Sequence, residues 1–145
     1  LADALAGADV LIGVSAGHIV DQDMIRSMNP QPIVFAMANP TPEIEPEDAA
    51  AAGAYIIGTG RSDYPNQINN VLAFPGIFKG ALAAGATEIN DAMKQAAVSA
   101  ISSCIPADQL APDHIIVSAL TPGVADKVAQ AVAQAARESG VIRHG

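Results

Sequence analysis

The sequence predicts an α/β fold of the doubly wound, Rossmann-like type, with a mostly parallel sheet and helices at the C-terminal end. Short apolar runs rich in Val and Ile alternate with helical patterns in the first half of the chain, and such runs are typical of strands buried on both faces of a parallel sheet. From residue 70 onward the apolar residues recur at helical spacing. The predicted strands are Val10–Val14, Ile33–Met37, Tyr55–Ile57 and Ile115–Ser118.

Local signals place helices between the first strands. Asp21 is a good N-cap for a helix that runs to Met28, because its side chain can accept a hydrogen bond from a free backbone N–H group. Glu45 is expected to cap a second helix, with Pro46 at its first position. Gly53 marks the end of this helix, because glycine readily adopts the left-handed conformation that terminates helices.

The second half of the chain predicts three longer helices. The first covers Val71–Ala84 and bends or restarts at Pro75, which has no N–H group. The second is expected to have its cap at Thr87 and to run to about residue 103. The third is expected to open at Thr121 and to end at Gly140.

Composition excludes several classes of protein. The chain has 145 residues and a formal net charge of −8, and this acidic balance argues against a general nucleic-acid binder, which needs a basic surface. Cys104 is the single cysteine, which excludes a disulfide scaffold and a cysteine-based zinc site and fits a reducing compartment. No apolar run approaches the ~18–20 residues of a membrane span. The length is that of one domain, predicted over residues 1–145.

The first candidate site is the turn Ile12–Gly17, which follows the first predicted strand. Ligands of open α/β sheets bind beyond the carboxyl ends of the strands, and small residues let the backbone approach a ligand closely. The alternative is a simple tight turn between a strand and a helix. No complete G-x-G-x-x-G fingerprint supports a phosphate cradle here.

The second candidate site is the segment Ala38–Glu43, in which Asn39 lies at the end of the next predicted strand. Pro40 restricts Asn39 to an extended conformation, and the Asn39 amide offers two donors and an acceptor oxygen to a ligand. Alternatively, the side chain satisfies its own backbone in a turn.

The third candidate site is Gly58–Gly76, GTGRSDYPNQINNVLAFPG, where polar side chains gather before a helix. An uncharged polar cluster beside a helix N-terminus suits an anionic or hydroxylated small ligand. Alternatively, Asn69 or Asn70 only caps the helix. The alternative interpretation of Arg61 and Asp63 is a local ion pair with no role in ligand binding.

The other reactive side chains have ordinary structural interpretations. Cys104 is expected to be a small buried apolar side chain. Solvated helix faces are expected for Lys79 and Lys94. The histidines have no metal-ligand spacing, and surface positions are expected for His18, His114 and His144.

Four segments together resemble the NAD(P)-binding domain of the short bacterial malic enzymes. They are GADVLIGVSAGHIV, PIVFAMANPTPEIEPEDA, GTGRSDYPNQINNVLAFPGIFKGAL and ATEINDAMKQAA. The resemblance is continuous from about Ala6 to Ala100 and resumes over Ala133–Arg143. Its most specific part is SDYPNQINNVLAFPG, in which an asparagine pair, a short apolar run and Phe-Pro-Gly follow in order.

The resemblance implies roles for particular residues. Asn39 and Asn70 match asparagines that contact the substrate and the cofactor, and Asn69 is a further candidate for the substrate. The residues that the resemblance places along the cofactor are Gly13, Val14, Ser15 and Ala16.

The resemblance also implies the reaction, which is oxidative decarboxylation of malate to pyruvate and CO2 with NAD or NADP as hydride acceptor and Mg²⁺ or Mn²⁺ as metal. The family's catalytic tyrosine and lysine, its metal ligands and the first strand of its sheet belong to motifs expected before Leu1. We therefore assign no catalytic or metal-ligating residue to this chain and expect the isolated chain to be inactive. The complete protein is expected to be a cytoplasmic homodimer without nucleic-acid or membrane partners.

Two alternatives remain open. The first is a non-catalytic module for nucleotide binding or for association with a partner. The second is part of another α/β NAD(P) dehydrogenase, such as one that acts on an amino acid. Asn39 and the Asn69–Asn70 pair argue against the second alternative.

Overall fold

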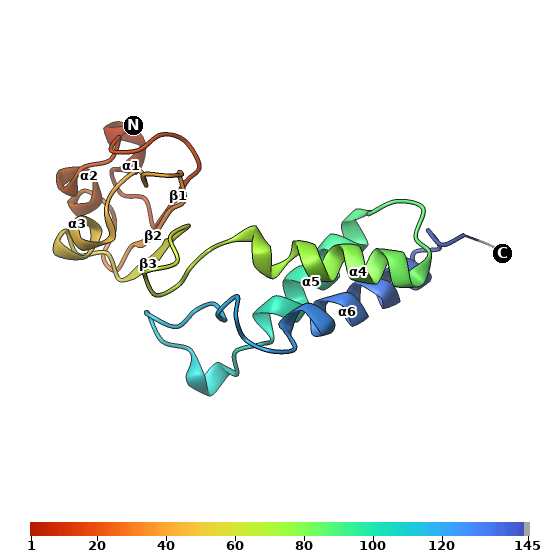
Figure 1. Cartoon of the computed structure of the whole chain (residues 1–145). Coiled ribbons are helices and arrows are strands. Elements are labelled where there is room, and N and C mark those ends of the chain that lie inside the picture. The colour runs from red at the N-terminus through yellow and green to blue at the C-terminus, as the bar shows by residue number, and fades with distance from the viewer. Residues whose placement is uncertain (144–145) are drawn as a thin grey trace. The chain divides into compact units, whose positions relative to one another are not determined.

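The computed structural model describes residues 1–143, which form two compact units (Figure 1). The first unit consists of Leu1–Ile68 and Leu110–Ile115. The second consists of Asn69–Gln109 and the chain from Ile116 onward. His144, for which a surface position was expected, lies outside the described residues.

The first unit contains a three-stranded parallel sheet. Its strands β1 (Val10–Gly13), β2 (Ile33–Ala36) and β3 (Ile56–Thr59) lie in the order β1-β2-β3. All three predicted strands of this region are therefore confirmed, to within two residues at each end. Because the strands are parallel, their carboxyl ends meet at one edge, where Gly13 pairs with Ala36 and Ala36 pairs with Thr59.

The helices of the first unit are α1 (Ala2–Leu5), α2 (Gln22–Arg26) and α3 (Pro46–Ala51). The Asp21 carboxylate accepts a 2.9 Å hydrogen bond from the Met24 N–H, which confirms the predicted cap of α2. Glu45 precedes α3 as expected, but its side chain makes no capping hydrogen bond, so that part of the prediction is wrong. Gly53 follows α3 with a φ of +98°, in the left-handed region expected for it.

The core of the first unit lies against one face of β1. Leu11 is 9% exposed, whereas Val10 and Ile12 on the opposite face are 44% and 64% exposed. The expectation of a strand buried on both faces is therefore wrong for β1 in the described chain, because side chains of this unit cover only the Leu11 side. The residues that form this core are Leu5, Leu11, Val20, Ile25, Met28, Val34, Ala36, Ile44 and Ala49.

The second unit is helical, and its α4 (Phe74–Ala84), α5 (Asp91–Ser102) and α6 (Val124–Glu138) lie together (Figure 1). Two glycines of α4 permit a close approach to α6. A Cβ atom on Gly76 would lie 2.5 Å from the Val128 Cβ, and one on Gly80 would lie 2.5 Å from the Ala129 carbonyl oxygen. Short 3-10 turns, Asn70–Leu72 and Ala107–Gln109, complete this unit, and the helix predicted from Val71 does restart near Pro75.

Two predicted helix caps in the second unit are wrong. Asn90 caps α5, accepting a 3.1 Å hydrogen bond from the Met93 N–H, while the Thr87 hydroxyl donates to the Val141 carbonyl at 3.0 Å. Helix α6 has Gly123 at its N-cap position, with a φ of +86°, instead of Thr121. Both Thr87 and Asn90 are common capping residues, and the tertiary contact of Thr87 decides between them.

The predicted fourth strand, Ile115–Ser118, is absent from the described residues. The Ile115 N–H donates to the Asn66 side-chain oxygen at 2.9 Å instead of to a neighbouring strand. Val117 is buried among the helices of the second unit. This apolar run packs against the core without pairing to a strand. An apolar run by itself does not distinguish a strand from an irregular buried segment.

Among the described residues, no helix combines the length and the apolar character that crossing a membrane requires.

Candidate functional site

The turn after β1 and the loop after β2 lie side by side at the carboxyl edge of the sheet. The Met37 N–H donates to the Gly13 carbonyl at 3.0 Å, which extends the β1–β2 pairing beyond the strands. Val14, Ser15 and Ala16 follow Gly13 and are exposed. The structure thus brings the predicted turn and the segment before Asn39 together at the edge where ligands of open α/β sheets bind.

A buried glutamate joins these two segments. Glu43 is 1% exposed, and its Oε1 atom accepts hydrogen bonds from the Ser15 N–H at 2.7 Å and from the Ser15 hydroxyl at 3.1 Å. Its Oε2 atom accepts a hydrogen bond from the Ala38 N–H at 3.1 Å. Gly13 has no room for a side chain here, because a Cβ atom would lie 2.5 Å from the Glu43 Cδ.

Glu43 is charged at neutral pH despite its burial. Burial acts to raise the pKa of Glu43, but the hydrogen bonds from the Ser15 and Ala38 N–H groups outweigh that effect and lower the pKa below its ordinary value. Glu43 is the last residue of the second candidate segment, Ala38–Glu43, but sequence reasoning gave it no role. Its only sequence signal is an acidic residue in the proline-rich run that follows a buried strand.

Asn39 projects an exposed amide at the same edge. Its only side-chain hydrogen bond to the described chain is a long one of 3.5 Å to the Met37 carbonyl, so its own backbone does not satisfy it. Gly60, just after β3, lies beside it, since a Cβ atom there would be 3.2 Å from the Asn39 amide nitrogen. The Asn39 amide therefore retains most of its capacity to bind a ligand.

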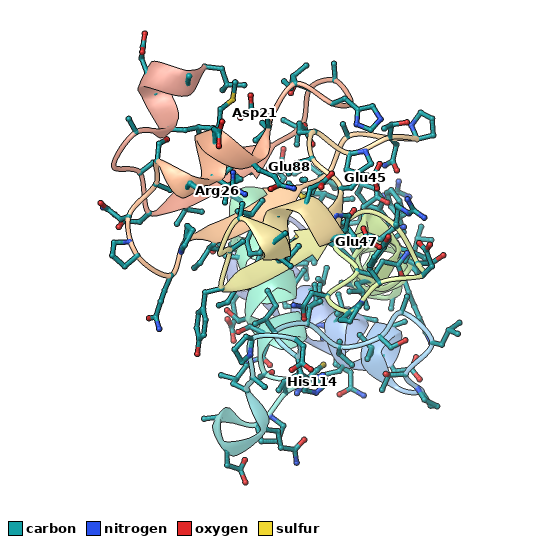
Figure 2. All side chains as sticks on the ribbon, turned by 90° about the vertical axis from the view of Figure 1, so that its left-hand side faces the viewer. Asp21, Arg26, Glu45, Glu47, Glu88 and His114 are labelled. Carbon is teal, nitrogen blue, oxygen red and sulfur yellow. The ribbon has the colours of Figure 1, made fainter. Side chains whose placement is uncertain are left out.

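The polar residues after β3 are largely paired with one another. Arg61 forms ion pairs with Asp63 at 2.6 Å and with Glu45 at 3.3 Å, and its guanidinium lies 4.9 Å from the centre of the Tyr64 ring. Tyr64 donates a hydrogen bond to Glu47, and Glu45 and Glu47 flank the start of α3 (Figure 2). The predicted local ion pair of Arg61 and Asp63 is confirmed.

These pairings shift the acidity of the groups involved. The hydrogen bond from Arg61 lowers the pKa of Asp63, and the same interaction raises the pKa of Arg61. The hydrogen bond to Glu47 raises the pKa of Tyr64 and lowers that of Glu47. The shift moves the pKa of Tyr64 further above neutral pH, whereas a tuned catalytic acid has a pKa close to the working pH.

The two neighbouring asparagines of the second unit differ in what they do. The Asn69 side chain accepts a 3.1 Å hydrogen bond from the Val71 N–H and caps the 3-10 turn. This agrees with the alternative interpretation that one of the two asparagines is a cap. Asn70 is exposed, and its side chain makes no hydrogen bond to the described chain. Asn39 belongs to the first unit and Asn70 to the second, so their joint contact with one ligand stays a prediction.

Asn66 belongs to the polar cluster predicted in Gly58–Gly76, where sequence reasoning gave it no separate role. It is 6% exposed and donates to the carbonyls of Ile57 at 3.0 Å and Pro112 at 2.8 Å. Its φ of +54° lies in the left-handed region, which asparagine tolerates better than most residues. Because its amide is satisfied by the backbone, Asn66 has a structural role.

The remaining reactive side chains have structural roles as expected. Cys104 is half-buried against the helical core, and Lys79 and Lys94 form exposed ion pairs with Asp126 and Asp91. Among residues 1–143 no cluster of three or more His, Cys, Asp or Glu side chains could hold a metal ion. Surface positions are confirmed for His18 and His114.

A parallel sheet with helices between its strands, and with a small-residue turn and an amide at the carboxyl ends of its first two strands, is typical of a Rossmann-like α/β domain. The chain belongs to the malic enzyme family, because residues 4–137 match the family model described as malic enzyme, NAD binding domain.

Known proteins agree with this assignment. The chain is 57% identical to the bifunctional malic/malolactic enzyme of Bacillus subtilis, over 99% of the chain and 35% of that protein, and 54% identical to the NAD-dependent malic enzyme of Geobacillus stearothermophilus, over 99% and 30%. The crystal structure of malic enzyme from Pyrococcus horikoshii superposes with a TM-score of 0.91 at 48% identity, over 99% of this chain and 33% of that one. The chain thus spans about a third of these relatives, and they support the predicted family and Rossmann-like fold.

Proposed function

We propose that this chain binds the nicotinamide cofactor within a malic enzyme, and that the complete protein oxidatively decarboxylates malate to pyruvate and CO2. The observation that carries this proposal is the match of residues 4–137 to the NAD binding domain of malic enzymes. That match favours the malic enzyme interpretation over the alternative of an amino acid dehydrogenase. Relatives named as NAD-dependent and as NADP-dependent both occur, so the proposal covers either cofactor.

The strand-end residues of the first unit fit a dinucleotide. The exposed backbone of Val14, Ser15 and Ala16 at the carboxyl edge, with Gly13 at its start, can lie along the cofactor, because small side chains allow close approach. When bound, the cofactor accepts a hydride from C2 of malate. The chain's part in this step is to fix the geometry, and such orientation can supply several kcal/mol of barrier lowering.

The amides of Asn39 and Asn70 fit the orientation of malate and nicotinamide. Each can donate from its NH2 group to a carboxylate and accept at its oxygen, without adding charge to the site. Their exposure and the scarcity of internal hydrogen bonds support this role. Asn69 already uses its oxygen as a cap, so it is the weaker substrate ligand.

We assign no metal ligand, catalytic acid or catalytic base of the reaction to the described residues. No suitable cluster for Mg²⁺ or Mn²⁺ lies within residues 1–143, Tyr64 is paired with Glu47 and Lys79 with Asp126. We propose that the rest of the complete protein supplies these groups. The homodimeric state, the cytoplasmic location and the lack of nucleic-acid or membrane partners stay predictions.

The experiment that tests the cofactor role compares two substitutions, one in the turn after β1 and one at the start of β1, in the complete protein. Val14→Glu places a negative charge on the exposed turn, at a side chain that is 76% exposed, and is expected to raise the KM for the cofactor about tenfold by repelling its phosphates. Val10→Glu makes the same change at the opposite end of β1 and is the control. A cofactor KM that both variants change equally, or that neither changes, would contradict the proposed path of the cofactor.

A further inference from the structure

We propose that Glu43 is a positioning residue of the cofactor site, whose buried carboxylate fixes the turn after β1 against the segment that carries Asn39. This inference rests on the proposed function, since it assigns Glu43 a role in holding residues that are proposed to contact the cofactor and the substrate.

The first support is that Glu43 binds two separate strand ends with its two oxygen atoms. Oε1 receives both hydrogen bonds from Ser15, and Oε2 receives the one from Ala38. Ser15 lies in the proposed cofactor turn, and Ala38 immediately precedes Asn39. One carboxylate therefore sets the position of both contact segments at once.

The second support is that the charge of Glu43 has no cationic partner in the described chain. The ion pairs of residues 1–143 do not include Glu43, so only backbone N–H groups and a hydroxyl offset its charge. A buried carboxylate is costly unless its hydrogen bonds are well aligned. These bonds therefore define the local geometry strictly, since any displacement of the turn would leave a buried charge poorly solvated.

The third support is the continuous contact between the two segments around Glu43. Backbone N–H groups of His18 and Val20 donate to the carbonyls of Pro42 and Glu43, each at 3.0 Å. A Cβ atom on Gly17 would lie 2.8 Å from the Thr41 Cβ, so the two segments are close-packed there as well. The turn has little freedom to move independently of Glu43.

Glutamine is the informative replacement because it keeps the size of glutamate while it removes the charge and exchanges one acceptor oxygen for a donor. A glutamine at this position has one acceptor oxygen and one NH2 donor. It can accept from Ser15 or from Ala38, but its other end then places a donor against an N–H donor. The turn and the Asn39 segment can no longer both keep their positions.

The test measures the dissociation constants of NADH and of NADPH from the complete protein. The fluorescence of the reduced nicotinamide reports binding. Glu43→Gln is expected to raise the dissociation constant of the preferred cofactor about tenfold, the effect of losing a hydrogen bond to a charged group. Glu45→Gln is the matched control, because Glu45 pairs with Arg61 and makes no capping bond, and it is expected to stay within about twofold.

A purely structural role would lower the thermal midpoint and leave the cofactor affinity of the folded protein unchanged. An unchanged dissociation constant in Glu43→Gln, together with weakened binding in Val14→Glu, overturns the role of Glu43 and leaves the proposed function intact. Unchanged binding in both variants overturns both. If Glu43→Gln does not fold, Ser15→Ala, which removes only the hydroxyl bond, is expected to raise the dissociation constant about threefold. An unchanged value there overturns the inference.

Discussion

Replacing Asn70 with alanine in the complete protein is expected to lower kcat/KM for malate about a hundredfold, the cost of one or two hydrogen bonds to a charged ligand. The stability of the fold is expected to be unaffected, because the Asn70 side chain is exposed and makes no hydrogen bond to the described chain. Asn39→Ala is expected to behave in the same way, because its amide has only one long internal contact. Steady-state kinetics with malate as the varied substrate measure both effects.

The neighbouring Asn69 provides the matched control. Asn69→Ala removes the cap of the 3-10 turn and is expected to cost about 1 kcal/mol of stability, with little change in malate turnover at temperatures well below unfolding. Thermal unfolding followed by circular dichroism measures the first effect. If Asn69→Ala lowered turnover and Asn70→Ala did not, the assignment of the two asparagines would be reversed.

The second large effect is expected from Gly13→Ala. The new Cβ atom would lie 2.5 Å from the Glu43 Cδ and 2.7 and 2.8 Å from its two oxygens, in a site where three hydrogen bonds hold the carboxylate. Overpacking of this kind costs about 1–3 kcal/mol, and the displaced carboxylate adds to that cost. The midpoint of urea denaturation of the complete protein is therefore expected to fall, and the cofactor KM to rise.

A double-mutant cycle with Glu43→Ala checks the cause. Glu43→Ala is itself destabilising, because it leaves the Ser15 and Ala38 N–H groups without their acceptor. It also removes the clash, so the further cost of Gly13→Ala is expected to drop below about 0.5 kcal/mol in that background. Additive costs would show that Gly13 does not act through Glu43.

Local patterns predicted much of the first unit. Short Val- and Ile-rich runs located β1, β2 and β3, and Asp21 and Gly53 located helix boundaries, because strand burial and capping depend on a few adjacent residues. The run Ile115–Ser118 was misjudged for a related reason. An apolar segment packs equally well as a strand or as an irregular segment, and only its hydrogen-bond partners, such as Asn66, distinguish the two.

The candidate site was predictable in its segments but not in its internal support. The strand-end positions of Gly13 and Asn39 follow from the order of strands and loops, because parallel strands bring their carboxyl ends to one edge. Glu43 could not be found this way, since the acidic run around it is typical of a solvated loop. Its burial depends on Ser15, which lies 28 residues earlier in the chain.

The most direct test of the account is the malate-dependent reduction of NAD and NADP by the complete protein with Mg²⁺ or Mn²⁺, with pyruvate and CO2 measured in the same reaction. The account predicts that reduced cofactor, pyruvate and CO2 appear in equal amounts, and that the isolated 145-residue chain forms none of them. Cofactor reduction without pyruvate, the absence of reduction with either cofactor, or turnover by the isolated chain would contradict it.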